Sequence, residues 1–182
     1  MATGGNAIDL GAQAEYSDLH AIIEESLSCA INLNDYKWFK ESITDASSIL
    51  YIGDNAGEVV FDRILTEQIR KVNSNNIVYA VREKPIINDA TIEDTIRVGL
   101  DKVVKVISSG SEAPATILSQ CSPEMKSMYN CADVIIANGQ GNYESLCNSP
   151  ENIFFFFKVK CPVIVRNCGY DVGTLALIRN SA

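Results

Sequence analysis

Four short segments of the sequence combine carboxylates, carboxamides, hydroxyls and glycines, which are the groups that bind divalent cations and phosphates. These segments are Gly53 to Glu58, Pro85 to Thr91, Ser108 to Ser111 and Asn138 to Tyr143. Within them, Asp54, Asn55 and Asp89 offer three hard oxygen donors, the ligand type that Mg²⁺ and Mn²⁺ prefer. The serine- and glycine-rich segments bring backbone N–H groups close to predicted helix starts, where an anion is held favourably. Together they indicate phosphate chemistry, although each segment alone also suits an ordinary turn or helix cap.

Lys158 follows four consecutive phenylalanines at residues 154–157. A charged side chain in such an apolar strand is costly unless it reaches solvent or a partner. Two interpretations stay open. Lys158 either ends the strand and extends into solvent, or its ammonium group reaches the polar segments and binds a phosphoryl oxygen.

The elements that must position these residues alternate along the chain. Amphipathic helices are predicted at 17–31, 36–43, 59–72, 92–100 and 124–131, and strands at 49–52, 77–81, 103–107, 134–137, 154–159 and 163–165. This alternation predicts an α/β fold, a three-layer α/β/α sandwich with a mostly parallel sheet. Only three residues separate the last two predicted strands, so one sheet edge is expected to be antiparallel. We expect a single domain over 1–182, with a mainly helical lead-in at 1–45 and the sheet core at 46–182.

The carboxyl ends of parallel strands meet at one edge of the sheet, where ligands bind in open α/β folds. The four polar segments each follow a predicted strand, so their side chains are expected to gather at that edge. The sequence therefore predicts a combined metal and phosphate site there.

Composition excludes several classes of function. The 182 residues include 23 Asp and Glu against 15 Lys and Arg, a formal charge of −8, which argues against nucleic acids and anionic membranes as partners. The longest apolar stretch, at 153–157, is far shorter than the roughly 20 residues that span a bilayer. The N-terminus has no secretory pattern, so a cytoplasmic location is expected. With one histidine in the chain, His-rich zinc sites and a Ser-His-Asp triad are nearly excluded.

Several spaced motifs, in order, resemble the DUF89 family of damage-control phosphatases. They are Gly5 to Gly11, Ile52 to Asp62, Asn88 to Thr91, Asn138 to Glu144 and Phe157 to Pro162. The resemblance implies a metal-dependent phosphatase of α/β/α architecture that acts on small phosphorylated metabolites, including sugar phosphates.

The resemblance also implies roles for individual residues. Asp54, Asn55 and Asp89 match the metal ligands, for Mg²⁺ or Mn²⁺, with Co²⁺ or Ni²⁺ as further candidates, and Lys158 matches the phosphate-binding lysine. The expected substrate-binding residues, besides Lys158, are Asn6, Asp9, Glu58, Asn88, Ser109, Gln140, Gly141, Asn142 and Tyr143. Either a water molecule or Asp54 itself can be the nucleophile, because sequence does not distinguish a nucleophile from a ligand.

Members of this family usually carry a helical region before the Gly-Asn-x-Ile-Asp motif, which here begins at Gly5. We therefore expect an open pocket with weak discrimination among phosphate esters and an exposed apolar patch that favours self-association. Two other functions were weighed. Gly53 to Glu58 can be interpreted as the nucleotide loop of an S-adenosylmethionine-dependent methyltransferase, although the full GxGxxG spacing is absent. The chain can also be a non-catalytic metabolite-binding domain.

Overall fold

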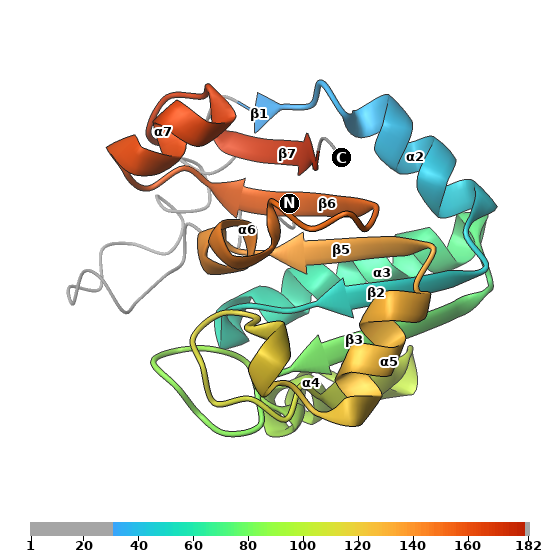
Figure 1. The fold of residues 1–182 in the computed structure, drawn as a ribbon. Helices are drawn as coiled ribbons and strands as arrows, with labels where there is room; N and C mark the ends of the chain where they lie inside the picture. The colour runs from blue at the N-terminus through green and yellow to red at the C-terminus, as the bar shows by residue number, and fades with distance from the viewer. Residues whose placement is uncertain (1–30, 181–182) are drawn as a thin grey trace, which may run out of the picture.

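In the computed structural model, residues 31–180 are described, and they form a seven-stranded sheet between two layers of helices (Figure 1). The strands lie in the order β1-β7-β6-β5-β2-β3-β4. They are β1 (Ile31–Asn32), β2 (Ser48–Ile52), β3 (Asn76–Val81), β4 (Lys105–Ser108), β5 (Val134–Asn138), β6 (Ile153–Lys158) and β7 (Leu175–Arg179). The helices are α2 (Tyr36–Asp45), α3 (Val59–Val72), α4 (Ile92–Val98), α5 (Pro123–Cys131), α6 (Gln140–Leu146) and α7 (Pro162–Cys168). The predicted α/β/α sandwich is confirmed.

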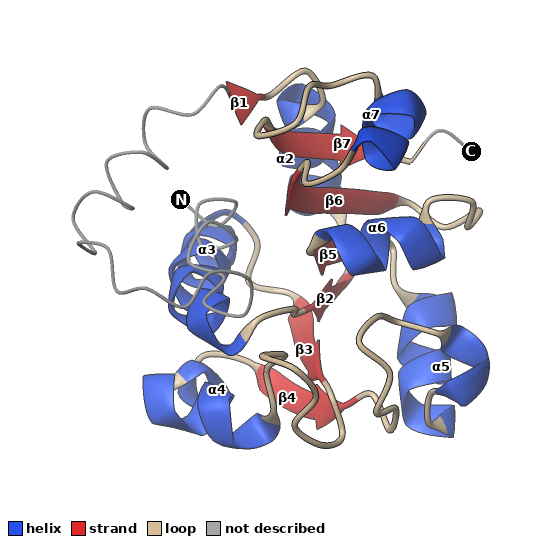
Figure 2. Cartoon of the chain, turned by 90° about the vertical axis from the view of Figure 1, so that its left-hand side faces the viewer, coloured by secondary structure: helices blue, strands red, loops and turns tan. Residues whose placement is uncertain are grey.

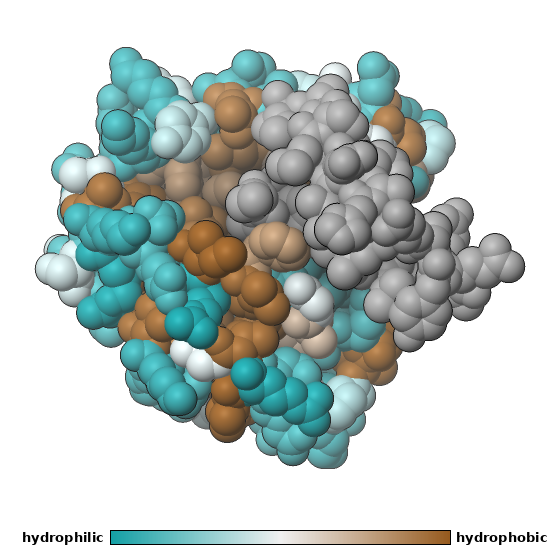
Figure 3. All heavy atoms as spheres, turned by 180° about the vertical axis from the view of Figure 1, so that it is seen from behind, coloured by the Kyte–Doolittle hydropathy of each residue, from teal (hydrophilic) through white to brown (hydrophobic). Residues whose placement is uncertain are grey.

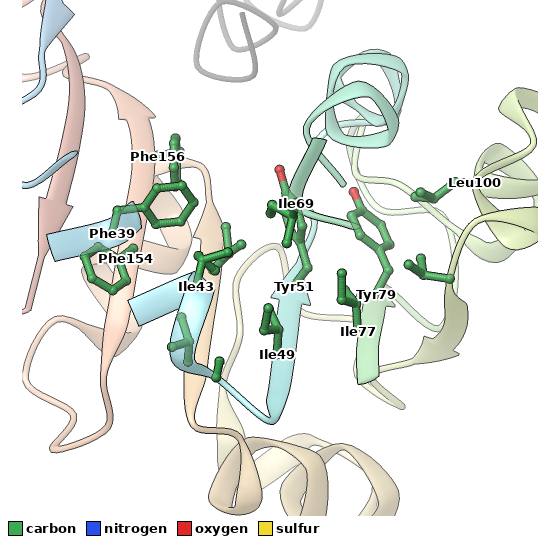
Figure 4. Packing of buried hydrophobic residues seen from close by; sticks show 14 of the residues in the cluster. Phe39, Ile43, Ile49, Tyr51, Ile69, Ile77, Tyr79, Leu100, Phe154 and Phe156 are labelled. Carbon is green, nitrogen blue, oxygen red and sulfur yellow. The ribbon is translucent and has the colours of Figure 1, made fainter. Parts of the chain in front are cut away.

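The two layers of helices bury opposite faces of the sheet, because successive strand residues point to opposite sides. Helices α2, α3 and α4 cover one face, and α5, α6 and α7 cover the other (Figure 2). In Figure 4, Phe39 of α2 packs edge-on against Phe154 and Phe156 of β6, with ring centroids 5.3 and 5.2 Å apart. Tyr51 and Tyr79 extend from β2 and β3 on the same face, toward α3.

Local sequence explains the main helix ends. At α4, Thr91 and Asp94 form a reciprocal capping box, and Gly99 ends the helix in the left-handed conformation, with φ 71°. At α5, the Ser122 side chain accepts a hydrogen bond from the Met125 N–H, and proline occupies the first turn. These signals are local, and both helices were predicted.

The parallel core of the sheet brings the polar segments together. β2 pairs in parallel with both β3 and β5, β3 with β4, and β5 with β6. The carboxyl ends of these strands therefore lie at one edge, as predicted. β6 and β7 are antiparallel, which confirms an antiparallel pair near one side of the sheet.

The strand that pairs with β6 in this antiparallel arrangement is β7, and not the strand predicted at 163–165. Residues 163–165 lie in α7, and β7 begins at Leu175. Pro162 in the first turn and Gly169 at φ 77° just past the helix favour this short helix over the β propensity of Val163, Ile164 and Val165. The helices α6 and α7 and the strand β7 were not predicted, and β4 begins two residues later than expected.

The predicted helix at 17–31 falls outside the described residues, except for Ile31, which lies in β1. Within the described range, no helix has the length and apolarity needed to cross a membrane. On the face seen in Figure 3, apolar side chains are exposed in patches between hydrophilic ones. Five exposed apolar side chains lie on α3 and α4, at Val60, Ile64, Val72, Ile92 and Ile96. Whether they drive self-association stays a prediction.

Candidate functional site at the carboxyl edge of the sheet

Three parallel strands end beside one another and supply the site. Asp54 lies two residues past β2, Arg82 directly follows β3, and Asn138 ends β5. The segment after Arg82 folds back over the end of β2, where the Ala90 N–H donates to the Asp54 carbonyl over 2.7 Å. Asn55 and Asp89 pair there as an isolated antiparallel bridge. This pairing brings together the three predicted metal ligands from segments 34 residues apart.

A buried arginine joins the two carboxylates. The Arg82 Nε donates to Asp89 Oδ2 over 2.8 Å, and its Nη2 lies 3.9 Å from Asp54 Oδ1. The side chain of Arg82 is only 2% exposed, whereas that of Asp54 is 12% exposed. The guanidinium group therefore lies beneath the carboxylates, and Asp54 faces solvent at the edge.

Asn55 is oriented by its acidic neighbours. Its amide nitrogen donates to Glu58 Oε1 over 2.7 Å and lies 3.3 Å from Asp54 Oδ2. Because the nitrogen is committed to carboxylates, the amide oxygen is the atom that remains suited to a cation. Glu58 is 1% exposed, and its second oxygen, Oε2, has no hydrogen-bond partner within the described residues.

The site holds more negative charge than its cations balance. Burial and the neighbouring Asp89 raise the pKa of Asp54 to about 7, although Arg82 and Lys160 act to lower it. Burial, Asp54 and Asp62 raise the pKa of Glu58 well above its usual range. Such carboxyl groups favour an added cation.

The donor set fits Mg²⁺ or Mn²⁺, which bind carboxylate and amide oxygens and keep several waters. Asp54 and Asp89 supply two carboxylates, and Asn55 supplies an amide. The described residues contain no group of three or more His, Cys, Asp or Glu side chains placed to hold a metal. Water and a substrate oxygen would therefore complete the coordination shell.

Gly139 leaves the space that Asp54 occupies. Its φ of 85° is one that residues with side chains rarely adopt, and an added Cβ would lie 1.9 Å from Asp54 Oδ2. The glycine between β5 and α6 is therefore required by both the turn and the position of Asp54.

Four of the predicted substrate contacts are buried. Asn142 is fully buried, and Tyr143 is 7% exposed with its ring stacked on Phe157 at a centroid distance of 4.7 Å. Glu58 and Ser109 are each 1% exposed. The Glu58 carboxylate accepts from Asn55, and the Ser109 hydroxyl accepts from the Ser111 N–H in its own loop. The sheet and its covering helices enclose these four side chains, and their predicted role in substrate binding stays a prediction.

Other predicted contacts stay at the edge. Gln140 is half-buried, accepts from the Lys160 N–H over 2.9 Å and donates to Glu144. Gly141 lies against the main chain at Pro114, and the Asn88 carbonyl accepts from Ala56. Their roles in substrate binding remain predictions. Asn6 and Asp9 lie outside the described residues.

The two lysines after the phenylalanine run differ in position. Lys158 is the last residue of β6, half-buried and paired with Leu175 of β7. Lys160, two residues beyond, is exposed, and its charge acts on the carboxyl groups of both Asp54 and Glu58. Lys160 is therefore a second candidate for phosphate binding, and the role predicted for Lys158 stays a prediction.

The sequence analysis missed Arg82 and a buried network around Asp62. Asp62 accepts hydrogen bonds from the hydroxyls of Tyr51 and Tyr79 over 2.7 and 2.6 Å, and from Asn138 Nδ2 over 2.6 Å. One signal was available for Arg82, since a charge at the end of an apolar strand requires a partner. The signal for Asp62 was weaker: its carboxylate lies on the apolar face of a predicted helix, which indicates a buried acidic side chain.

Comparison with known proteins agrees with this geometry. Residues 1–175 match the damage-control phosphatase ARMT1-like domain. A damage-control phosphatase of Pyrococcus horikoshii is 42% identical over 181 residues, covering 99% of this chain and 63% of the relative. An uncharacterised protein of Methanocaldococcus jannaschii is 39% identical over 181 residues, covering 96% and 59%. A damage-control phosphatase of Archaeoglobus fulgidus is 32% identical over 181 residues, covering 94% and 60%.

The fold agrees as well. The crystal structure of a DUF89 family protein from Pyrococcus horikoshii matches with a TM-score of 0.89 and 42% identity, covering 99% of this chain and 64% of that one. The chain thus spans about three fifths of the length of these relatives. The family match runs through every segment of the carboxyl edge, from Asp54 to Asn142, and the chain therefore belongs to the damage-control phosphatase ARMT1-like family, also called DUF89.

Proposed function

We propose that this chain hydrolyses phosphate monoesters of small metabolites, sugar phosphates among them, with the help of a divalent cation. The observation that carries the proposal is the convergence of Asp54, Asn55 and Asp89 at an edge with excess negative charge. Two relatives named damage-control phosphatases support it. These relatives are longer than the matched part. That this chain has the activity named for them is therefore part of the proposal.

Different residues of the chain would have different roles in this reaction. Asp54, Asn55 and Asp89 would hold Mg²⁺ or Mn²⁺, and a bound ion supplies charge stabilisation at the phosphoryl oxygens. Lys160 would offset further charge on the same oxygens, a role assigned to Lys158 from the sequence alone. In the reaction, an oxygen of water or of Asp54 forms a bond to phosphorus, the ester P–O bond breaks, and the leaving oxygen takes a proton to become the alcohol. If Asp54 attacks, water then hydrolyses the acyl phosphate to phosphate and the free carboxylate.

The test is release of inorganic phosphate from a panel of small phosphate esters, with and without Mn²⁺. Asp54→Asn should abolish release, while Asp101→Asn, at an exposed acid outside the site, should keep it. Equal release by the wild type and Asp54→Asn would contradict the proposal. If the wild type binds Mn²⁺ and releases no phosphate from any ester, the non-catalytic alternative is correct.

The two lysines provide a matched pair. Lys160→Met should raise KM for the best ester by about 10-fold, because a charge near the phosphoryl group is lost. Lys158→Met should change KM less than twofold, an order-of-magnitude expectation on the same grounds. The reverse order would return the phosphate-binding role to Lys158.

A labelling experiment decides the nucleophile. Hydrolysis in ¹⁸O-labelled water under single-turnover conditions leaves label in Asp54 only if that carboxylate attacks phosphorus and its acyl phosphate is then hydrolysed at the carbonyl carbon. Label found in phosphate alone means that water attacks phosphorus, either in the ester or in an acyl phosphate on Asp54, and detection of phosphorylated Asp54 after an acid quench separates these two routes.

A further inference from the structure

Within the described residues, the Arg82 side chain contacts four polar side chains, and two of them, Thr116 and Asn142, lie outside the loops that carry the predicted metal ligands. Its Nη1 donates to Thr116 Oγ1 over 3.2 Å, and its Nη2 donates to Asn142 Oδ1 over 3.3 Å. Its remaining contacts are the carboxylates of Asp54 and Asp89. The planar guanidinium group thus relates the two carboxylates to α6 and to the segment that follows β4.

Thr116 and Asn142 hold each other as well as the arginine. Asn142 Oδ1 accepts from the Thr116 N–H over 2.9 Å and from its hydroxyl over 2.8 Å. The Asn142 amide nitrogen donates to the Asn138 carbonyl over 2.6 Å and approaches the Gly53 carbonyl at 3.4 Å. Thr116 and Asn142 are 1% and 0% exposed, so substrate does not reach them.

From this geometry we propose that Arg82, Thr116 and Asn142, which we name the Arg82 clamp, are positioning residues for the cation site. The clamp fixes the separation and orientation of the Asp54 and Asp89 carboxylates, and so acts on metal binding without touching metal or substrate. The inference rests on the proposed metal-dependent function. It adds Arg82 and Thr116, which the sequence motifs do not identify as part of the site, and gives Asn142 a positioning role in place of the expected substrate contact.

Charge and geometry predict opposite effects of Arg82, which makes the clamp testable. A positive charge beside a cation site repels the cation, so an arginine that acted by charge alone would weaken metal binding. A clamp strengthens it, because ligands held in place lose less freedom when the ion binds. Arg82→Lys keeps the charge and loses the planar fork, whereas Arg82→Gln loses both.

The experiment is calorimetric titration of Mn²⁺ into the full chain and its variants, with thermal unfolding measured in parallel. We expect Arg82→Lys and Arg82→Gln each to weaken Mn²⁺ binding by about 10-fold or more, the usual effect of removing a supporting contact at a metal site. Thr116→Val should weaken it several-fold, and Thr116→Ser should recover most of the loss by restoring the hydroxyl.

Thr66 provides the matched control. It is also fully buried, and its hydroxyl has no partner within the described residues, so Thr66→Val removes the same group without breaking a contact. Its Mn²⁺ affinity should equal that of the wild type. Wild-type affinity in Arg82→Lys, or tighter binding in Arg82→Gln, would overturn the clamp.

If the arginine variants do not fold, Thr116→Val decides, because an affinity equal to that of Thr66→Val also overturns the clamp. The proposed function fails in a different way. A wild type that binds no Mn²⁺ overturns that function and the clamp with it, whereas a wild type that binds Mn²⁺ leaves the variants to judge the clamp alone.

Discussion

Asp89 at the edge of the sheet and Asp62 beneath it are both buried carboxylates, but their hydrogen-bond donors differ in charge. Asp89 accepts from the guanidinium group of Arg82 over 2.8 Å and lies beside Asp54, whose side chain is 12% exposed. Asp62 is 0% exposed and accepts from two tyrosine hydroxyls and one carboxamide, all neutral. The edge therefore gathers charge around an opening, and the interior encloses one carboxyl group completely.

This difference indicates that the fold uses aspartate in two ways, as a structural residue in the interior and as a candidate cation ligand at the edge. Burial raises the pKa of Asp62 to about 6, although its three donors act to lower it. Its hydrogen bonds join β2, β3 and β5 to α3 below the site, so we interpret it as structural. At the edge, converging carboxylates beside solvent are suited to binding a cation. The predictions that follow test this division between an acid that binds and an acid that supports.

The largest effect is expected at Asp89. Asp89→Asn should reduce Mn²⁺-dependent phosphate release by about 1,000-fold, because a carboxylate that holds the cation is lost. The matched variant Asp62→Asn should retain most of the activity per folded molecule. Steady-state hydrolysis, corrected for the folded fraction, measures both. Comparable losses in the two variants would remove the distinction between edge and interior.

Asp62 should instead appear in the pH dependence of stability. The folded state holds the Asp62 proton to higher pH than the unfolded chain does, since its pKa is raised from 3.8 to about 6. The wild type should therefore lose about 3 kcal/mol of unfolding free energy, relative to Asp62→Asn, as pH rises from about 3 to about 7. Urea unfolding of both proteins across this range measures the difference. Parallel pH profiles would show that Asp62 does not titrate in the fold.

A comparison of alanine substitutions at Gly139 and Gly169 separates the effect of backbone strain from the effect of crowding against Asp54. Gly139→Ala places a Cβ against Asp54 Oδ2 and should weaken Mn²⁺ binding by about 10-fold through displacement of that carboxylate. Gly169→Ala shares the positive φ but meets no atom within 4 Å, so it should cost stability of about 1 kcal/mol and leave Mn²⁺ binding unchanged. Calorimetric titration and thermal unfolding of both variants provide the comparison. Equal Mn²⁺ affinities would mean that Asp54 tolerates the crowding.

The smallest effect is expected from one tyrosine hydroxyl. Tyr79→Phe removes a donor to Asp62 and should lower the unfolding free energy by about 1–2 kcal/mol at neutral pH, with a smaller loss near pH 4, where the carboxyl group is protonated. Hydrolysis per folded molecule should not change. A loss of activity larger than the loss of folded protein would assign the interior network to the site.

Much of the fold was predictable because its signals are local. Strands β2, β3, β5 and β6 and helices α3 and α5 agree with the sequence prediction to within about two residues, the usual uncertainty of element ends. For each of these elements, the apolar residues and capping residues that indicate it lie within the element or directly beside it in the sequence. The strand predicted at 163–165 was wrong, because three β-branched residues in a row also fit a short helix that buries one of them, Ile164.

The candidate site divides in the same way. Asp54, Asn55 and Asp89 could be identified from the sequence, because oxygen ligands directly after strands form a short pattern and the strand ends of a parallel sheet converge. Arg82 could not, since its contacts with Thr116 and Asn142 join residues 34 and 60 positions away. Tyr143 lies within a loop motif, yet its ring packs in the core.

The sequence by itself therefore determined the layers of the sandwich, the mostly parallel sheet and the edge at which the polar segments meet. Only the tertiary structure decided which polar side chains reach that edge and which support it from below. The physical reason is that the burial and hydrogen-bond partners of a side chain depend on the register of several strands and on the helices packed over them. Asp62 and Asp89 have the same chemistry in the sequence, and their separate surroundings exist only in the folded chain.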